Sequence, residues 1–295
     1  SLEAIKHFSK YIFSEDESKV ILATQEERIY RRSKLGYYYV FDIVTNKAEL
    51  LVDFRIQEPT FSPDGLKVAY GFNNNIFIKH LESGEIIQVT FDGEKNKIIN
   101  GITDWVYEEE LSCRDGFRWS PDGEQIAYWQ SNTKNIGTFY MINNVDSLYS
   151  KPIPLPYPKV GTKNSDVKVG VVNVSGGNTE WFDIPGDPTN NYLARMDFIP
   201  NSNEVMIQQL NRKQNANTVW IGDTKTMALN SIFTDKDDAW LDIHDNIMWL
   251  ENENYFTWTS EKDGWLHLYK VSRDGKEFST ITKGNIDVVR INCIG

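Results

Sequence analysis

Two stretches of this sequence share one pattern: Phe61-Ser62-Pro63-Asp64-Gly65-Leu66-Lys67-Val68-Ala69-Tyr70 and Trp119-Ser120-Pro121-Asp122-Gly123-Glu124-Gln125-Ile126-Ala127-Tyr128. The proline presets φ at the second turn position, while aspartate and glycine supply a local hydrogen bond and a permissive backbone. The residues that follow alternate between apolar and polar, as a half-buried strand requires. Each stretch therefore predicts two short strands joined by a tight turn.

Weaker copies of this turn begin at Phe13, Ile199 and Trp249, so the unit repeats along the chain. A second hairpin follows the unit, with turns at Glu82 to Glu85, Ser175 to Asn178 and Arg273 to Lys276, and further pairs begin at Tyr37 and Thr218. Two hairpins make four antiparallel strands, which is one blade of a β-propeller. We expect an all-β chain of about five blades, with another beginning after Ile281.

The spacing between successive turns is about 48, 58, 80 and 50 residues, against about 40–50 for an ordinary blade. The excess in the third unit lies between roughly Asn100 and Lys168. Insertions in repeat proteins gather on one face, often the binding face. The long unit is therefore the place to look for a site.

Composition limits the classes of function. The chain has 295 residues, and 31 Lys plus Arg against 42 Asp plus Glu give a net charge of −11. This acidic balance disfavours nonspecific binding of nucleic acid, which is a polyanion. The 15 Phe, 14 Tyr and 9 Trp favour pleated structure. No stretch approaches the roughly 18 apolar residues that span a bilayer.

The two cysteines, Cys113 and Cys293, form no C-x-x-C pattern, so we expect two separate thiols and no zinc site. No His/Cys/Asp cluster has the spacing of metal ligands, and no glycine-rich phosphate loop is present, so no metal or cofactor is expected. The chain starts at Ser1 with no signal-like segment, which is typical of a processed chain or a recombinant fragment.

The long unit contains an acidic run within Asn100-Gly101-Ile102-Thr103-Asp104-Trp105-Val106-Tyr107-Glu108-Glu109-Glu110. Asp104 is placed to cap a short helix whose first turn would carry the acids near the positive end of the helix dipole. A generic acidic triplet of this kind is most often a solvated helix face. The functional alternative is a clamp for an ammonium group, with Trp105 and Tyr107 as rigid supports.

The run from Asn100 to Glu110 resembles the segment that binds the substrate amino terminus in the dipeptidyl peptidase IV family. Two flanking blocks resemble the same family in the same order. One extends from Phe61 through Asn75-Ile76-Phe77-Ile78-Lys79, and the other comprises Pro156-Tyr157-Pro158-Lys159 with Gly161, Asn164 and Val167-Lys168. The specific resemblance covers about residues 50 to 175, with Ile281-Thr282-Lys283-Gly284 as a further landmark.

The resemblance implies a serine exopeptidase with an N-terminal eight-bladed propeller and a C-terminal α/β-hydrolase domain, which removes dipeptides from peptides whose second residue is Pro or Ala. Glu109 and Glu110 would bind the free α-ammonium of the peptide through charge-assisted hydrogen bonds. Glu108 matches the third acid of the family motif and is assigned no contact. Arg55 matches an arginine that holds a substrate carbonyl, although a simple rim charge is an equal interpretation.

The catalytic groups themselves are missing from this sequence. No Gly-x-Ser-x-Gly is present, so the turn that presents a hydrolase nucleophile is absent. None of the four histidines follows such a turn, and the Ser…Asp…His order is not satisfied. We therefore assign residues 1–295 to the propeller domain, with an incomplete ring and no catalytic residue, and expect the chain alone to be inactive.

Two alternatives remain open at this stage. Some propeller relatives lack the nucleophile and act as binding modules of membrane proteins. A prolyl oligopeptidase-like endopeptidase ranks last, because it does not count from the substrate terminus and has no need of Glu109 and Glu110. The expected partners are peptides with a free N-terminus, the hydrolase domain of the same polypeptide and, by resemblance, a second copy in a homodimer. By resemblance the parent protein is exported, to a periplasm or the cell exterior.

Overall fold

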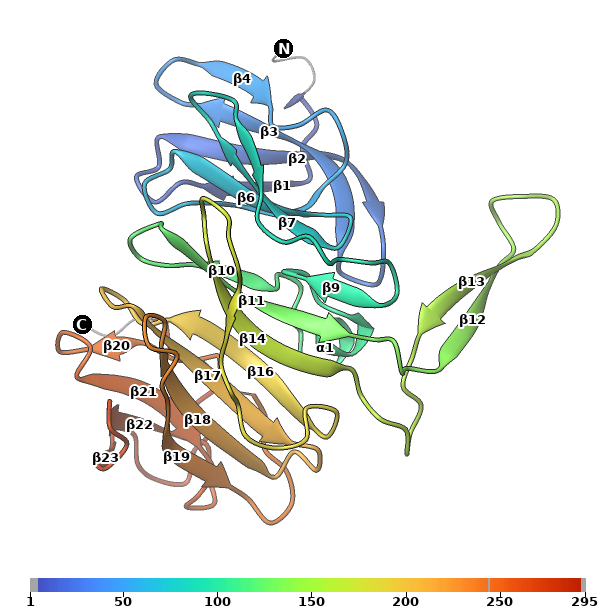
Figure 1. Ribbon diagram of the computed structural model, residues 1–295. Coiled ribbons are helices and arrows are strands. Elements are labelled where there is room, and N and C mark those ends of the chain that lie inside the picture. The colour runs from blue at the N-terminus through green and yellow to red at the C-terminus, as the bar shows by residue number, and fades with distance from the viewer. Residues whose placement is uncertain (1–4, 244, 293–295) are drawn as a thin grey trace. The chain divides into compact units, whose positions relative to one another are not determined.

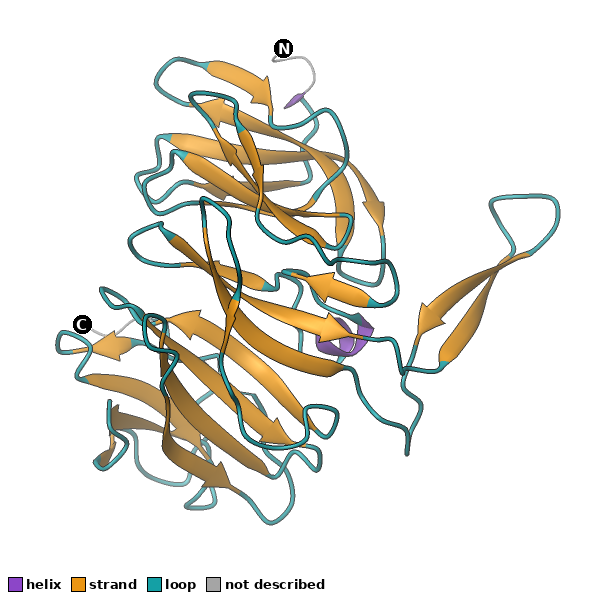
Figure 2. Cartoon of the chain, viewed as in Figure 1, coloured by secondary structure: helices purple, strands orange, loops and turns teal. Residues whose placement is uncertain are grey.

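The computed structural model describes residues 5–243 and 245–292, and they form an almost entirely β structure (Figures 1 and 2). Chain contacts divide the protein into two compact units, Ser1–Trp181 and Phe182–Gly295. Within the described residues the single α-helix, α1, covers Trp105–Glu109. No described helix has the length and apolar character needed to cross a membrane. The prediction of an all-β propeller architecture is confirmed.

The first unit holds three blades, each with its strands in sequence order from the first to the last. The strands of blades 1 and 2 are β1 (Lys10–Phe13), β2 (Lys19–Arg28), β3 (Lys34–Asp42), β4 (Lys47–Leu50), β5 (Gln57–Phe61), β6 (Lys67–Phe72), β7 (Asn75–His80) and β8 (Ile86–Gln88). Blade 3 consists of β10 (Phe117–Trp119), β11 (Gln125–Asn132), β14 (Asp166–Asn173) and β15 (Glu180–Trp181), and β9 (Ile98–Asn100) pairs with β11.

The second unit holds two more four-stranded blades. Their strands are β16 (Asn191–Phe198), β17 (Glu204–Asn211), β18 (Ala216–Asp223), β19 (Leu229–Lys236), β20 (Trp249–Leu250), β21 (Tyr255–Ser260), β22 (His267–Ser272) and β23 (Phe278–Thr280). The five blades match the repeat read from the sequence. No strand is described between Ile281 and Asn292, where the next blade was expected to begin.

The repeated turn is built as its residues require. In blade 2 the Ser62 hydroxyl donates to Asp64 Oδ1 at 2.5 Å, and the Gly65 N–H donates to the Ser62 carbonyl at 2.9 Å. Blade 3 repeats these bonds at Ser120, and blade 1 repeats the hydroxyl–carboxylate bond at Ser14. The same bond occurs at Ser272, in the turn between β22 and β23 of blade 5. The hydrogen bonds from Ser14 and Ser18 hold the pKa of Asp16 at about 2.

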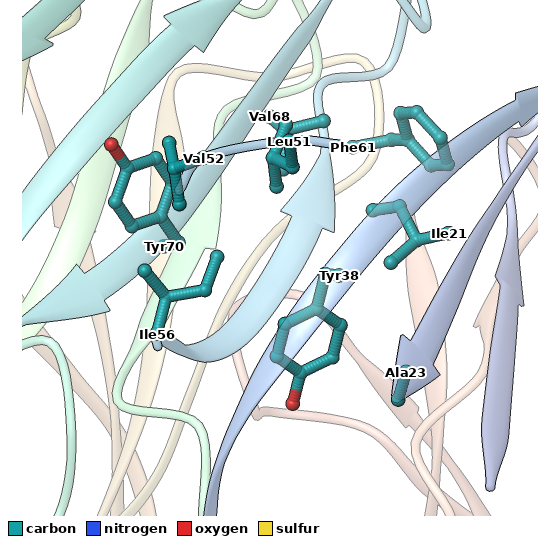
Figure 3. Close-up of a cluster of buried hydrophobic side chains, with 9 residues drawn as sticks. All are labelled: Ile21, Ala23, Tyr38, Leu51, Val52, Ile56, Phe61, Val68 and Tyr70. Atoms are coloured by element: carbon teal, nitrogen blue, oxygen red, sulfur yellow. The ribbon is translucent and has the colours of Figure 1, made fainter. Parts of the chain in front are cut away.

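Neighbouring blades bury their apolar faces against each other. One core joins Ile21, Ala23 and Tyr38 of blade 1 to Val68 and Tyr70 of blade 2 (Figure 3). Equivalent clusters join blade 2 to blade 3 and blade 4 to blade 5. Successive side chains of a strand point to opposite faces of the sheet, so alternating apolar residues give each blade an apolar face. Burial of these side chains is the main contribution to the stability of the fold.

The excess residues of the long unit form α1 and a separate two-stranded hairpin. This hairpin pairs β12 (Thr138–Asn143) with β13 (Lys151–Pro156) and projects away from blade 3 in Figure 1. Its exposed apolar side chains include Phe139, Tyr140, Met141 and Ile142. Both insertions fall inside the range predicted from the spacing of the turns.

The turn of blade 1 offers a stability prediction. Glu17 occupies the place that glycine takes at positions 65 and 123, and it adopts φ +55. The left-handed conformation costs a non-glycine residue about 1–2 kcal/mol, and the greater freedom of glycine in the unfolded chain returns part of this. We expect Glu17→Gly to raise the free energy of unfolding by about 0.5–1 kcal/mol in urea titrations.

The matched control is Glu15→Gly, which changes an exposed residue of the same turn that has no positive φ. It should leave the stability unchanged or lower it. If Glu17→Gly lowers the free energy of unfolding as Glu15→Gly does, the left-handed backbone at position 17 does not destabilise the protein.

Candidate functional site

The helix α1 is positioned by the segment that precedes it. Asn100 is fully buried, and its amide nitrogen donates to Asp92 Oδ1 at 2.8 Å and to Asn75 Oδ1 at 3.2 Å. Its amide oxygen accepts from Gln130 Nε2 at 2.8 Å. These bonds join blade 2 to blade 3 at the start of the motif, so the segment that leads into α1 has a fixed origin.

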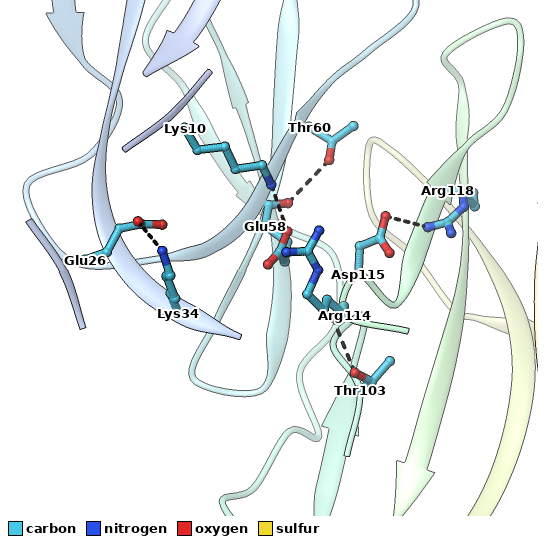
Figure 4. A network of polar contacts seen from close by, with 9 residues as sticks. All are labelled: Lys10, Glu26, Lys34, Glu58, Thr60, Thr103, Arg114, Asp115 and Arg118. Atoms are coloured by element: carbon cyan, nitrogen blue, oxygen red, sulfur yellow. Dashed lines mark hydrogen bonds and ion pairs between the residues drawn. The ribbon is translucent and has the colours of Figure 1, made fainter. Parts of the chain in front are cut away.

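Gly101 is required by both space and backbone. It adopts φ +69, and a Cβ atom at this position would lie 2.3 Å from Ile76 Cγ1. After it, the Thr103 hydroxyl donates to the Cys113 carbonyl at 2.6 Å and to the Arg114 carbonyl at 3.4 Å, which ties the start of the segment to its end. Figure 4 shows the contact with Arg114. The loop therefore leaves and re-enters blade 3 at one place, with α1 between the two ends.

Asp104 is the N-cap of α1, as the sequence predicted. Its Oδ1 accepts the Tyr107 N–H at 3.0 Å, and its Oδ2 accepts the Ser165 hydroxyl at 2.5 Å. Burial raises the pKa of this carboxyl, while the bonds from Ser165 and the helix backbone oppose the rise. The cap consequently also joins α1 to the residue that precedes β14.

The two aromatic residues of the motif behave differently. Tyr107 is buried, whereas Trp105 is half-buried and its ring centroid lies 4.4 Å from that of Tyr157. Tyr157 belongs to the second block of the family resemblance, and its ring also lies 5.6 Å from that of Phe139. The support of α1 by aromatic packing thus extends to the base of the β12–β13 hairpin.

The three glutamates have three different environments. Glu108 is fully buried, and its Oε1 accepts the backbone N–H groups of Arg32 at 2.6 Å and Ser33 at 3.0 Å. The Glu109 side chain is only 13% exposed, and Glu110 is exposed. Successive residues of a helix point about 100° apart, so Glu108 is buried, Glu109 is largely covered and Glu110 is exposed.

The position of the acids along the helix corrects one expectation. Only Glu108 lies in the first turn of α1; Glu109 is its last residue and Glu110 its C-cap. The helix ends after five residues, so Glu109 and Glu110 lie at the negative end of the dipole and not at the positive end. This end favours a bound cation.

A cation is already present beside Glu109. Arg31 Nε lies 3.3 Å from Glu109 Oε2, and the Arg31 side chain is 75% exposed. Arg31 belongs to the connection between β2 and β3, where the Ile29 N–H donates to the Ser33 carbonyl at 3.0 Å. Sequence reasoning missed this contact, because only the Arg31-Arg32 pair at a hairpin tip signals it and its partner is far along the chain.

The same hairpin contacts Arg55. The Arg55 Nη2 lies 3.0 Å from Glu27 Oε1, its Nε donates to the Gln25 carbonyl at 3.4 Å, and its guanidinium lies 5.1 Å from the centre of the Tyr37 ring. The side chain is 34% exposed. Thus one hairpin contacts Arg55 through residues close to its tip and Glu109 through Arg31 at the tip itself.

Tyr30 lies at the tip as well. Burial first, and then the carboxylates of Asp104 and Glu108, raise the pKa of Tyr30 to about 12. Nearby, Lys34 Nζ lies 2.7 Å from Glu26 Oε2 and braces the two strands of the hairpin (Figure 4). The tip is therefore held by polar contacts on both strands.

The remaining candidate residues are the histidines and cysteines. No group of His, Cys, Asp or Glu able to hold a metal is found in the part of the chain that the structure describes. Cys113 is a buried thiol, and Cys293 and His244 lie outside the described residues.

The family of this propeller is shown by its similarity to known proteins. The sequence model described as dipeptidyl peptidase IV (DPP IV) N-terminal region matches residues 14–294, so the chain belongs to this family. The crystal structure of Porphyromonas gingivalis dipeptidyl peptidase 4 has a TM-score of 0.91 and 33% sequence identity, over 98% of this chain and 42% of that one.

Curated relatives are similar over nearly the whole sequence. Prolyl endopeptidase FAP of Homo sapiens is 27% identical over 96% of this chain and 40% of its own length, and dipeptidyl peptidase 4 of Felis catus is 28% identical over 96% and 40%. Inactive dipeptidyl peptidase 10 of Mus musculus is 27% identical over 96% and 38%. The chain spans about 40% of the length of these relatives.

The geometry at Gly101 yields a prediction. Gly101→Ala adds a clash with Ile76 to the cost of a positive φ, and we expect it to lower the free energy of unfolding by about 2–4 kcal/mol. Gly161→Ala is the control, because Gly161 also has a positive φ, +83, but nothing lies within 4 Å of the added Cβ. It should cost only about 1 kcal/mol. Equal losses in thermal unfolding would contradict the close approach.

Proposed function

We propose that this chain is the substrate-binding and gating propeller domain of a dipeptidyl peptidase IV-like serine exopeptidase, which releases X-Pro or X-Ala dipeptides from peptide N-termini. Glu109 and Glu110 clamp the α-ammonium of the substrate. The observation that carries this proposal is the pair of adjacent acids at the C-terminal end of α1, of which Glu109 is paired with Arg31 and Glu110 is exposed.

The chemistry of such a clamp follows from its groups. An ammonium has three N–H donors, and two carboxylates accept charge-assisted hydrogen bonds from it. Fixing the end of the peptide selects the bond to be cleaved by distance from that end, because the second peptide bond then falls at one place. Arg55 supplies donors for a substrate carbonyl, once its guanidinium turns from Glu27 and Gln25.

Catalysis itself requires groups outside these 295 residues. A Ser/His/Asp triad on the α/β-hydrolase domain of the same polypeptide performs the cleavage, and the propeller alone is inactive. The parent protein acts outside the cytoplasm, in a periplasm, secreted or at the cell surface, and pairs as a homodimer. Membership of the family and similarity to proteins named dipeptidyl peptidase 4 support the peptidase activity of the parent protein. Export and the homodimer are proposed from the family resemblance alone.

One specific finding favours a second candidate function. The Mus musculus relative, which is as similar to this chain as the Homo sapiens relative, is named an inactive dipeptidyl peptidase. A similar sequence therefore also occurs in a protein that is named as lacking this activity. In that case the chain is a binding module of a partner protein. The sequence that follows residue 295 in the gene decides between the two, through the presence or absence of Gly-x-Ser-x-Gly.

The clamp is tested in the full-length enzyme with a Gly-Pro chromogenic substrate. Glu109→Ala and Glu110→Ala should each lower kcat/KM by roughly 30- to 5000-fold, because truncating a desolvated charged contact costs about 2–5 kcal/mol. Glu85→Ala, at an exposed turn between β7 and β8, is the control and should keep wild-type kinetics. Normal kinetics in both clamp variants, or efficient cleavage of an N-acetylated substrate, would refute the proposal.

Arg55 is tested separately. Arg55→Met should lower kcat/KM about 10- to 150-fold, because a hydrogen bond from a charged donor contributes about 1.5–3 kcal/mol. Glu27→Gln removes the ion-pair partner but keeps the guanidinium, and it should have little effect. If Arg55→Met retains full activity, Arg55 is only a charge on the rim.

A further inference from the structure

The pair between Arg31 and Glu109 is unequal in its exposure. Glu109 is 13% exposed and Arg31 is 75% exposed, with a distance of 3.3 Å between Nε and Oε2. The carboxylate is therefore mostly covered by protein while its partner stands mostly in solvent. Because the Arg31 side chain stands mostly in solvent, the pair contributes little more than an exposed ion pair, and a second cation can take the place of Arg31.

The backbone that carries Arg31 is held more firmly than its side chain. Glu108 Oε1 binds the N–H groups of Arg32 and Ser33, the two residues that follow Arg31. Its other oxygen is buried and has no hydrogen-bond partner among the described residues. The bonds to the hairpin tip are thus the polar contacts that the structure gives this buried carboxylate, and they fix the tip against α1.

We propose that Arg31 is the resident counter-ion of Glu109, that the substrate ammonium takes its place, and that Glu108 is the positioning residue that keeps Arg31 there. This inference rests on the proposed function, and it adds the regulation of the same site. In the empty site, Arg31 neutralises a carboxylate that is mostly covered by protein. On binding, the peptide must displace it, so Arg31 lowers the affinity for amines and keeps weakly held cations out.

The first test is the kinetics of Arg31→Met in the full-length enzyme, with the Gly-Pro chromogenic substrate. KM should fall about two- to five-fold with kcat unchanged, which is the size of an exposed ion pair. The control is Arg28→Met, which removes the same charge from an exposed position at the end of β2. It should change KM much less, because no ion pair of the Arg28 side chain is described.

The outcomes separate this inference from the proposed function. If Glu109→Ala abolishes activity but Arg31→Met leaves KM unchanged or raises it, the counter-ion is refuted and the clamp stands. An unchanged Glu109→Ala enzyme would refute both. A KM that falls equally in Arg28→Met would show a general charge effect and would also overturn the role of Arg31.

The role of Glu108 is tested by a double-mutant cycle. Glu108→Ala frees the hairpin tip, so adding Arg31→Met to it should no longer lower KM. Glu108→Gln keeps an oxygen for both N–H groups and should retain the full effect of Arg31→Met. The same fall in KM in the Glu108→Ala background would refute the positioning role. Thermal unfolding of each variant shows whether the protein is folded. If Glu108→Ala does not fold, the proposal still requires Arg31→Met to lower KM fully in the Glu108→Gln background, and a lost effect there would refute it.

Discussion

The candidate site depends on one buried carboxylate. Glu108 turns inward from α1 and binds two backbone N–H groups at the tip of the β2–β3 hairpin. This contact joins the helix inserted in blade 3 to the first blade of the same unit. Because neighbouring helix positions point in different directions, fixing Glu108 inward directs Glu109 and Glu110 elsewhere: Glu109 pairs with Arg31 and Glu110 is exposed.

The motif is long because several residues before Glu108 also hold the helix in place. Asn100 anchors its start between blades 2 and 3, Gly101 permits the close approach to Ile76, and Asp104 caps the helix and holds Ser165. A helix of five residues has little stability of its own. Its orientation therefore comes from these side-chain contacts, and the acids at its end inherit a defined position from them.

Sequence reasoning predicted the parts that depend on local rules. The Ser-Pro-Asp-Gly turns and alternating strands gave the blades, the spacing of the turns gave the insertion, and Asp104 was recognisable as an N-cap. The prediction that the first turn of the helix carries all three acids was wrong. Only Glu108 lies in the first turn, whereas Glu109 ends the helix and Glu110 is its C-cap. The contacts of Glu108 and Arg31 were missed because they join residues more than 70 positions apart, and no local pattern records such a pairing.

The central claim is that the ammonium of a peptide replaces the Arg31 guanidinium that is paired with Glu109. A crystal structure of the full-length protein with a bound X-Pro dipeptide tests it most directly. The account predicts the peptide α-nitrogen within hydrogen-bond distance of the carboxylates of both Glu109 and Glu110, with Arg31 moved off Glu109. A dipeptide bound with its nitrogen elsewhere, and the Arg31–Glu109 pair intact, would contradict it.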